Sequence, residues 1–254
     1  MSLTGFLKAA QDWPLHPLFE IAAYVLAYRY YLRLRGRSRD TFSSEQRLWI
    51  LVGAAGGALI FSRFLAVLEN PGFFSDPGWR AWALLSNKTI VGGLLGGLLG
   101  VELVKKILGL KASSGDLMAY PLLLGMILGR IGCFFAGLHD ATYGAPTDLP
   151  WGVDWGDGIH RHPSNLYEIL FLAALWLGLR GLEGRRALAD GMRFKLFMVA
   201  YLGFRFAAEF LKPIHPLAFG LSAIQLACIA GLLYYAPTLL RPERWFVVPS
   251  GEAG

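Results

Sequence analysis

The residues most able to do chemistry in this 254-residue sequence are charged side chains that interrupt long apolar stretches. They are Glu20, Arg63, Glu102, Arg130, Glu168, Arg205 and Glu209. An arginine at bilayer depth is energetically costly unless it faces a cavity or a counter-charge. Arginine is also the side chain best shaped to hold a phosphate through two parallel hydrogen bonds. These charges favour a site for an anionic phospholipid headgroup, with ion pairs that only fix helix register as the alternative.

Two ion pairs are expected among these charges. Arg205 and Glu209 are four residues apart, which places both side chains on one face of a helix. Glu168 follows Ser164 by one helical turn, so it is placed to reach Arg130 from a neighbouring helix. Each pair would bring a carboxylate to an arginine within the membrane.

A polar loop from His139 to His162 follows the apolar stretch that carries Arg130. A neutral imidazole in this loop could accept a proton at neutral pH. Asp140 could orient His139, although adjacent side chains rarely bond to each other. His162 could instead cap the helix that follows it. His139 and Asp140 are therefore the candidates for proton transfer.

The sequence predicts no metal site and no cofactor. Cys133 and Cys228 fall within apolar stretches, which indicates small packing residues rather than a disulfide framework or a zinc site. His16 and His215 each precede a proline and are interpreted as structural. The sequence contains no serine-nucleophile motif, phosphate-binding glycine loop or dinucleotide fingerprint.

The elements that must position these residues are membrane-spanning helices. Apolar residues make up 55% of the chain, and the mean hydropathy is +0.45. Apolar stretches of spanning length lie at about 17–34, 47–68, 89–108, 117–138, 164–180, 193–211 and 221–240. A short amphipathic segment precedes them. We expect an all-α integral membrane protein, in which residues 1–254 form one domain, a bundle of about seven transmembrane helices.

The positions of lysine and arginine predict how the bundle is oriented. Outside the apolar stretches, most lysines and arginines lie in every second loop. Cytoplasmic loops of membrane proteins typically carry such an excess of positive charge. This pattern places the N-terminus outside and the C-terminus in the cytoplasm. The loops at about 70–88 and 139–163 then lie on the outer face, where we expect them to form a small cap. The net charge of +6 is explained by the cytoplasmic loops, and no nucleic-acid partner is expected.

Glycines recur every four residues in the third stretch, at Gly92, Gly96 and Gly100, with Gly93 and Gly97 beside them. Small residues at this spacing line one helix face and let a neighbouring helix or a lipid chain approach closely. From the spacing, we favour packing against another helix over contact with a lipid.

Five segments of the sequence resemble the prolipoprotein diacylglyceryl transferase family. They are residues 129–137 (GRIGCFFAG), 143–153 (YGAPTDLPWGV), 161–168 (RHPSNLYE), 203–210 (GFRFAAEF) and 221–225 (LSAIQ). The third segment is close to the family's Arg-His-Pro-Ser-Gln-Leu-Tyr-Glu. The resemblance extends from about the third apolar stretch to the seventh.

The resemblance implies a multi-pass enzyme of the bacterial inner (plasma) membrane with seven helices. That family moves the diacylglyceryl group of phosphatidylglycerol onto the lipobox cysteine of a preprolipoprotein and releases glycerol phosphate. By this resemblance, Arg130 and Arg205 would hold the lipid phosphate as catalytic residues. The implied binding residues are Gly92, Gly93, Gly132, Gly137, Tyr143, Gly144, His162, Tyr167, Glu168 and Glu209.

The sequence also departs from the family pattern. Val91 stands where the family has the histidine of its His-Gly-Gly motif, and valine cannot transfer a proton. Cys133 and Ala136 replace two asparagines, and the loop that carries His139 and Asp140 is longer.

Three interpretations follow from this mixture. The chain could open phosphatidylglycerol, or another anionic phospholipid, with a different proton-transfer group and a different acceptor. It could modify lipoproteins in the family's usual way, with the arginines supplying most of the charge stabilisation. It could also bind phospholipid without catalysing a reaction.

Overall fold

The computed structural model describes residues 3–38, 41–70, 87–140, 142–213 and 216–247, and within these ranges the chain is helical, with β-structure limited to isolated bridges. The helices are α1 (Leu3–Gln11), α2 (Leu15–Arg37), α3 (Ser44–Glu69), α5 (Ile90–Ile107), α6 (Asp116–Ala136), η2 (Gly137–His139), α7 (Ser164–Arg185), α8 (Met192–Ala208), η3 (Glu209–Leu211), α9 (Ala223–Leu239) and η4 (Pro242–Arg244). The predicted all-α class is confirmed.

Each of the predicted apolar stretches corresponds to one long helix, from α2 to α9. The largest difference is in α7, which continues to Arg185 instead of ending near residue 180. Its last turns contain Arg180 and Glu183, which are good helix formers with side chains long enough to reach past an apolar layer. The end of the sixth stretch forms the short helix η3 instead of a continuation of α8.

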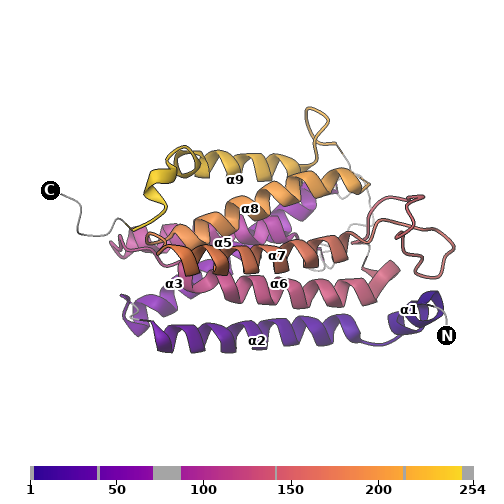
Figure 1. Cartoon of the computed structure of the whole chain (residues 1–254), viewed down its shortest axis with the longest axis horizontal. Coiled ribbons are helices and arrows are strands. Elements are labelled where there is room, and N and C mark those ends of the chain that lie inside the picture. The colour runs from indigo at the N-terminus through magenta and orange to yellow at the C-terminus, as the bar shows by residue number, and fades with distance from the viewer. Residues whose placement is uncertain (1–2, 39–40, 71–86, 141, 214–215, 248–254) are drawn as a thin grey trace.

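The long helices run alongside one another between two ends of the molecule (Figure 1). One end holds α1 and the 142–163 loop, where the Leu138 amide donates a hydrogen bond to the Gln11 side chain (3.1 Å). The other end holds η4, and there Arg47 donates to the carbonyl of Ser114 (3.1 Å). The chain therefore passes from one end to the other with each long helix.

The outward faces of these helices are apolar. Ile60, Leu103, Leu170, Leu177 and Leu233 are all at least 60% exposed. In water, such a surface would favour association, whereas a lipid bilayer covers it. The helices α3 and α7, and the stretch Asp116–His139, are long and apolar enough to cross a membrane, and α9 is a shorter apolar helix. The expected membrane character is thus supported, while the number of spans stays a prediction.

Side-chain caps determine where three of the long helices begin. Ser43 and Gln46 form a capping box at the start of α3, and Ser222 with Gln225 forms another at the start of α9. In each box, the serine accepts from one backbone amide while the glutamine accepts from another, so otherwise unpaired donors are satisfied. Thr89 accepts from the amide of Gly92 at the start of α5.

The glycine face of α5 packs directly on α3. A Cβ atom at Gly96 would overlap the carbonyl oxygen of Gly57, and one at Gly100 would overlap that of Gly53. Gly92 likewise lies against the backbone of α3, whereas Gly93 has more room. The helix-packing interpretation of these glycines is confirmed. A role for Gly92 and Gly93 in substrate binding stays a prediction.

The 142–163 loop packs against α1 and the end of α6, whereas its place in an outer-face cap stays a prediction. Trp155 is 1% exposed, and its indole donates to the carbonyl of Phe134 (3.0 Å). Leu7 of α1 and Val153 complete this small core. The other predicted cap loop, at about 70–88, lies almost entirely outside the described residues.

The close contact between α3 and α5 can be tested with a pair of alanine substitutions. We expect Gly96→Ala to lower the stability of the protein by about 1–3 kcal/mol, because the new methyl group must separate two packed backbones. Gly178→Ala on α7 adds a methyl group where no atom lies within 4 Å. It should stabilise the protein by about 0.5–1 kcal/mol. Thermal unfolding in detergent measures both, and equal shifts would contradict the packing described here.

Candidate functional site

Buried charged side chains form a cluster where α6, α7 and α8 meet. Nε of Arg130 on α6 lies 3.0 Å from Oε2 of Glu168 on α7. Arg205, near the end of α8, donates from Nη2 to Oε2 of Glu209 at 2.5 Å. Arg130 is 7% exposed, and the other three side chains are less exposed. Both ion pairs expected from the sequence are confirmed.

Glu168 is the centre of this cluster. Its Oε1 accepts a hydrogen bond from the hydroxyl of Tyr201 on α8 (2.8 Å), while its Oε2 faces Arg130. Arg205 also lies within electrostatic range of the same carboxylate. A charge that is removed from water is stable only when partners replace its hydration. Glu168 therefore connects α7 to both neighbouring helices.

Each of the two guanidinium groups has a buried N–H donor that is not used by the described residues. Among the described residues, Nε of Arg130 and Nε of Arg205 are buried and have no hydrogen-bond partner. The contact between Arg130 Nε and Glu168 is close, but it is not aligned for a hydrogen bond. Buried donors without partners are uncommon in folded proteins. Guanidinium donors suit the oxygens of a phosphate, so the cluster can accept an anion.

Lys212 adds a third cation beside the two arginines. It directly follows η3, and its backbone amide donates to the carbonyl of Glu209 (3.1 Å). Burial, together with the charges of Arg205 and Arg130, lowers the pKa of the Lys212 amine to about 8, although Glu209 and Glu168 act in the opposite direction. The amine is therefore charged below pH 8 and neutral well above it.

The predicted binding residues of the 142–163 loop come together at the start of α7. The amide of Gly144 donates to the carbonyl of His162 (2.8 Å). Nδ1 of His162 lies 3.2 Å from the hydroxyl of Tyr167, which also accepts from the indole of Trp151 (2.8 Å). Tyr143 lies on the same loop, with its ring beneath the guanidinium of Arg161. These contacts are all within the protein, so the role of Tyr143, Gly144, His162 and Tyr167 in substrate binding stays a prediction.

Gly132 and Gly137 allow neighbouring segments to approach α6. A Cβ at Gly132 would come within 2.8 Å of Phe19, so its absence lets the start of α2 lie against α6. Gly137 has a φ of +53°, and a Cβ there would lie 2.5 Å from the ring of Trp155. These contacts explain both glycines by packing, and their predicted role in lipid binding is untested.

The two candidates for proton transfer, His139 and Asp140, have different surroundings in the structure. His139 is exposed at the end of η2. Asp140 is partly buried, accepts a hydrogen bond from Thr142 (2.7 Å), and has Oδ1 at 3.9 Å from Nδ1 of His16. The histidine that faces Asp140 is therefore His16, which was interpreted from the sequence as structural. Val91, which the sequence analysis compared with the family's histidine, is 1% exposed in the apolar core.

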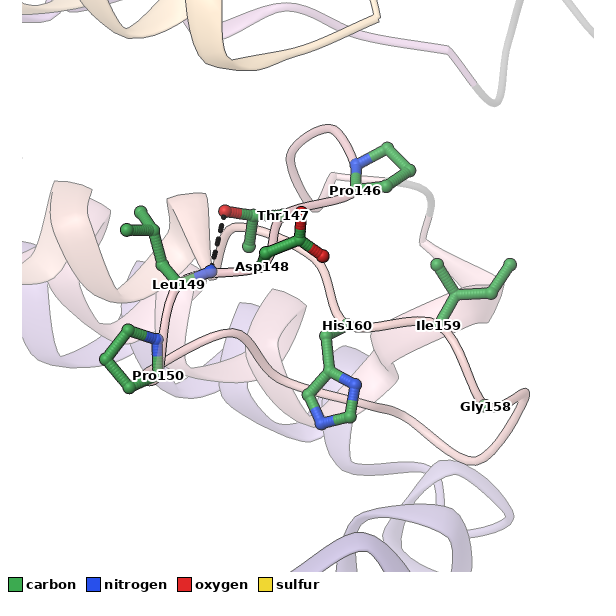
Figure 2. Close-up of a pocket in the computed structure, with 8 residues that line it drawn as sticks. All are labelled: Pro146, Thr147, Asp148, Leu149, Pro150, Gly158, Ile159 and His160. Atoms are coloured by element: carbon green, nitrogen blue, oxygen red, sulfur yellow. Dashed lines mark hydrogen bonds between the residues drawn. The ribbon is translucent and has the colours of Figure 1, made fainter.

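An open pocket lies within the 142–163 loop (Figure 2). Its wall includes Thr147 and Asp148 on one side and His160 on the other. Thr147 Oγ1 accepts from the amide of Leu149 (3.3 Å). None of the predicted site residues lines this pocket, and neither do the buried arginines. It is therefore separate from the charged cluster.

Sequence reasoning missed three residues of these sites. Tyr201 lies one helical turn before Arg205, and that spacing could have indicated it as a partner within the cluster. Lys212 lies three residues after Glu209, but only its tertiary surroundings, with two arginines nearby, make it unusual. His16 is far from Asp140 in the sequence, and no pattern there relates them.

Comparison with known proteins supports the resemblance found in the sequence. The sequence model of the prolipoprotein diacylglyceryl transferase family matches residues 15–240. A phosphatidylglycerol–prolipoprotein diacylglyceryl transferase from Methylococcus capsulatus is 31% identical over 232 residues, which cover 84% of this chain and 83% of that protein. The enzyme of the same name from Nitratidesulfovibrio vulgaris is 35% identical over 242 residues, covering 87% and 81%. That from Geobacter sulfurreducens is 30% identical over 201 residues, covering 77% and 76%.

The buried ion pair can be tested through stability. We expect Glu168→Leu to destabilise the protein by about 3–5 kcal/mol, because it leaves Arg130 buried without a counter-charge. Adding Arg130→Met should recover part of this loss, since the double variant no longer buries that unpaired charge. Thermal unfolding in detergent measures both variants. A double variant less stable than Glu168→Leu would show that the charge pairing is not the cause.

Proposed function

This chain belongs to the prolipoprotein diacylglyceryl transferase family, a family of transferases, and we propose that it transfers the diacylglyceryl group of phosphatidylglycerol to the cysteine thiol of a prolipoprotein. The names of its relatives supply the two substrates. The observation that carries the proposal is the buried pair of arginines with unsatisfied donors, which offers a site for the lipid phosphate.

The proposed setting is the bacterial inner membrane, crossed seven times, with the N-terminus outside and the C-terminus in the cytoplasm. The alternation of the long helices between two ends supports this arrangement (Figure 1). Arg37, Arg185 and Arg244 come at or after the ends of helices that finish at the same end of the bundle, as expected for the cytoplasmic side. The cluster of Arg130 and Arg205 then lies toward the outer leaflet.

The charge balance of the cluster supports a phosphodiester as its ligand. Arg130, Arg205 and protonated Lys212 carry three positive charges, whereas Glu168 and Glu209 carry two negative charges. The cluster therefore has one unbalanced positive charge, and the phosphodiester of phosphatidylglycerol carries one negative charge. Binding such an anion would neutralise the site and also supply acceptors for the unsatisfied guanidinium donors.

In the proposed mechanism, the acceptor thiolate attacks the glyceryl carbon that bears the phosphate. A carbon–sulfur bond forms, the carbon–oxygen bond breaks, and glycerol phosphate leaves with the bonding electrons. Arg130 and Arg205 stabilise the charge that develops on the leaving group. Glu168 and Glu209 hold the two guanidinium groups in place so that little reorganisation is needed during the reaction.

The reaction can be tested by mass spectrometry of purified protein mixed with phosphatidylglycerol and a lipobox peptide. We expect the peptide to gain one diacylglyceryl mass. The double variant Arg130→Gln, Arg205→Gln should lose turnover by at least about 100-fold, which is the loss typical of removing a group that stabilises transition-state charge. The control is Arg193→Gln, which removes an arginine paired with Glu183 on the opposite half of the bundle.

Turnover that survives in the double variant would contradict the proposed role of the arginines. If the lipid is consumed while the peptide remains unmodified, the acceptor is a different molecule. If neither substrate changes but phosphatidylglycerol co-purifies with the protein, the chain binds the lipid without catalysis.

The lowered pKa of Lys212 leads us to expect that lipid binding depends on pH. Because its pKa is lowered to about 8, the third positive charge is present below pH 8 and is lost as the pH rises through that value. The affinity for phosphatidylglycerol should therefore fall between pH 7 and pH 9. Lys212→Arg should remove this dependence, since arginine stays protonated throughout. Native mass spectrometry at both pH values measures it, and an equal fall in the variant would assign the effect to another group.

A further inference from the structure

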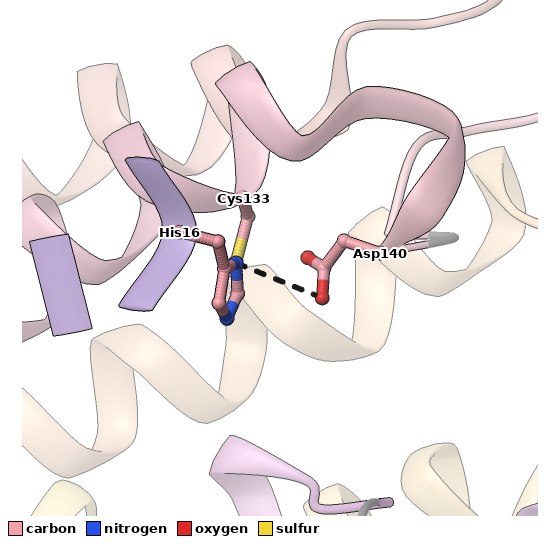
Figure 3. A group of neighbouring side chains, drawn as sticks. All are labelled: His16, Cys133 and Asp140. Atoms are coloured by element: carbon pink, nitrogen blue, oxygen red, sulfur yellow. Dashed lines mark ion pairs between the residues drawn. The ribbon is translucent and has the colours of Figure 1, made fainter. Parts of the chain in front are cut away.

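His16, Cys133 and Asp140 form a second cluster (Figure 3), and its cysteine lies near Arg130. One donor atom from each side chain lies within 4.8 Å of the other two: a ring nitrogen, the thiol sulfur and a carboxylate oxygen. They come from the first turn of α2, the last turn of α6 and the residue after η2. The missing side chain of Gly132 brings them together, because it lets residues 16–19 lie against α6.

The imidazole of His16 is oriented as a metal ligand would be. Its Nδ1 is buried and has no hydrogen-bond partner among the described residues, and it points toward Asp140 at 3.9 Å. Its Nε2 faces Oε2 of Glu20 at 3.8 Å, and Glu20 is paired with Lys88. Metal-binding histidines usually present their second ring N–H to such a carboxylate, which fixes the tautomer and leaves the other nitrogen free.

The donor set identifies the class of metal. A thiolate, an imidazole and a carboxylate suit zinc, whereas magnesium and calcium prefer oxygen ligands. Catalytic zinc sites commonly have three protein ligands and an open fourth position. In a tetrahedral zinc site the donor atoms lie roughly 3.5 Å apart, given bond lengths of about 2.0–2.3 Å. Small side-chain rotations would bring the three donors to that spacing.

We propose that His16, Cys133 and Asp140 bind one Zn²⁺, and that the acceptor thiol occupies its fourth position. The role of the acceptor rests on the function proposed above, whereas the metal site rests on the geometry of the cluster alone. The site lies next to the proposed phosphate site, because Arg130 Nη1 is 3.9 Å from the Cys133 sulfur, one helical turn away.

Zinc at this position would promote deprotonation of the acceptor thiol, which Val91 cannot do because valine does not accept a proton. The nucleophile in the transfer is a thiolate, and a bound metal ion keeps a thiol deprotonated at neutral pH. The thiol proton passes to solvent when the sulfur binds zinc. The sulfur then uses a lone pair to form the bond to the glyceryl carbon, while glycerol phosphate leaves with the electrons of the carbon–oxygen bond. The product is a neutral thioether, a weaker zinc ligand that dissociates.

Zinc binding itself is tested with the full chain in detergent, first stripped with a chelator and then dialysed against Zn²⁺. We expect one zinc ion per chain by elemental mass spectrometry. His16→Ala and Cys133→Ser should each lose it, and Glu20→Gln should weaken binding by about 10–100-fold, as is typical of a residue that orients a ligand. His139→Ala and Cys228→Ala are the matched controls, because they remove the neighbouring histidine and the other cysteine.

A second readout does not depend on variants. Co²⁺ in place of zinc should give the near-ultraviolet absorption of a thiolate–cobalt bond, and a lipobox peptide should strengthen that band, whereas the same peptide with serine for cysteine should not. Stoichiometric zinc whose binding survives in both ligand variants would overturn the assignment, and so would a chain that binds no zinc.

Activity measured on the same samples separates this inference from the proposed function. Turnover that disappears on chelation and returns with zinc, but not with magnesium, would support both. Turnover in a chain that binds no zinc would leave the transferase function standing and reject the metal. Zinc bound at these residues without any turnover would support the site and reject the proposed transferase.

Discussion

The arrangement of the bundle depends on how Arg130 is neutralised inside an apolar environment. A buried guanidinium without a counter-charge would destabilise the fold, so α7 must present Glu168 to α6 at contact distance. Glu168 in turn requires a second partner, which Tyr201 supplies from α8. The ion pair between Arg130 and Glu168 and the hydrogen bond from Tyr201 therefore join three helices. The cluster also gathers several charges in one place inside the bundle. Burying these charges costs desolvation free energy, but it creates a site that can bind a charged headgroup.

The last turns of α6 connect the two halves of the proposed reaction. In the proposed mechanism Arg130 faces the leaving group, and Cys133, three residues later, lies on the same side of the helix beside His16 and Asp140. The glycines on either side make this possible, since Gly132 admits α2 and Gly137 admits Trp155 of the loop. Val91, at the position that the sequence analysis compared with the family's His-Gly-Gly histidine, fills the apolar core. In the account proposed here, the cluster of His16, Cys133 and Asp140 takes over the activation of the acceptor thiol.

Hydropathy and spacing predict most of the fold. Each apolar stretch became a helix because a segment in hydrocarbon must satisfy its own backbone hydrogen bonds. The pairing of Arg205 with Glu209 followed from helical geometry, and that of Arg130 with Glu168 from the need for a counter-charge. The contact between His16 and Asp140 could not be predicted, because it depends on how closely α2 approaches α6. The lowered pKa of Lys212 likewise arises from tertiary burial, which no local pattern records.

If Arg130 and Arg205 hold a lipid phosphate, their guanidinium nitrogens must lie close to its phosphorus atom. Measuring that nitrogen–phosphorus distance tests the proposed function most directly. Solid-state NMR on the protein in phosphatidylglycerol bilayers, with nitrogen-15 in its arginine side chains, detects guanidinium nitrogens that lie close to phosphorus. Single Arg130→Lys and Arg205→Lys variants assign the signals. We expect phosphorus-dependent dephasing at both guanidinium groups, because each would be in direct contact with the same phosphate. Bound lipid with no dephasing at either arginine would contradict this expectation.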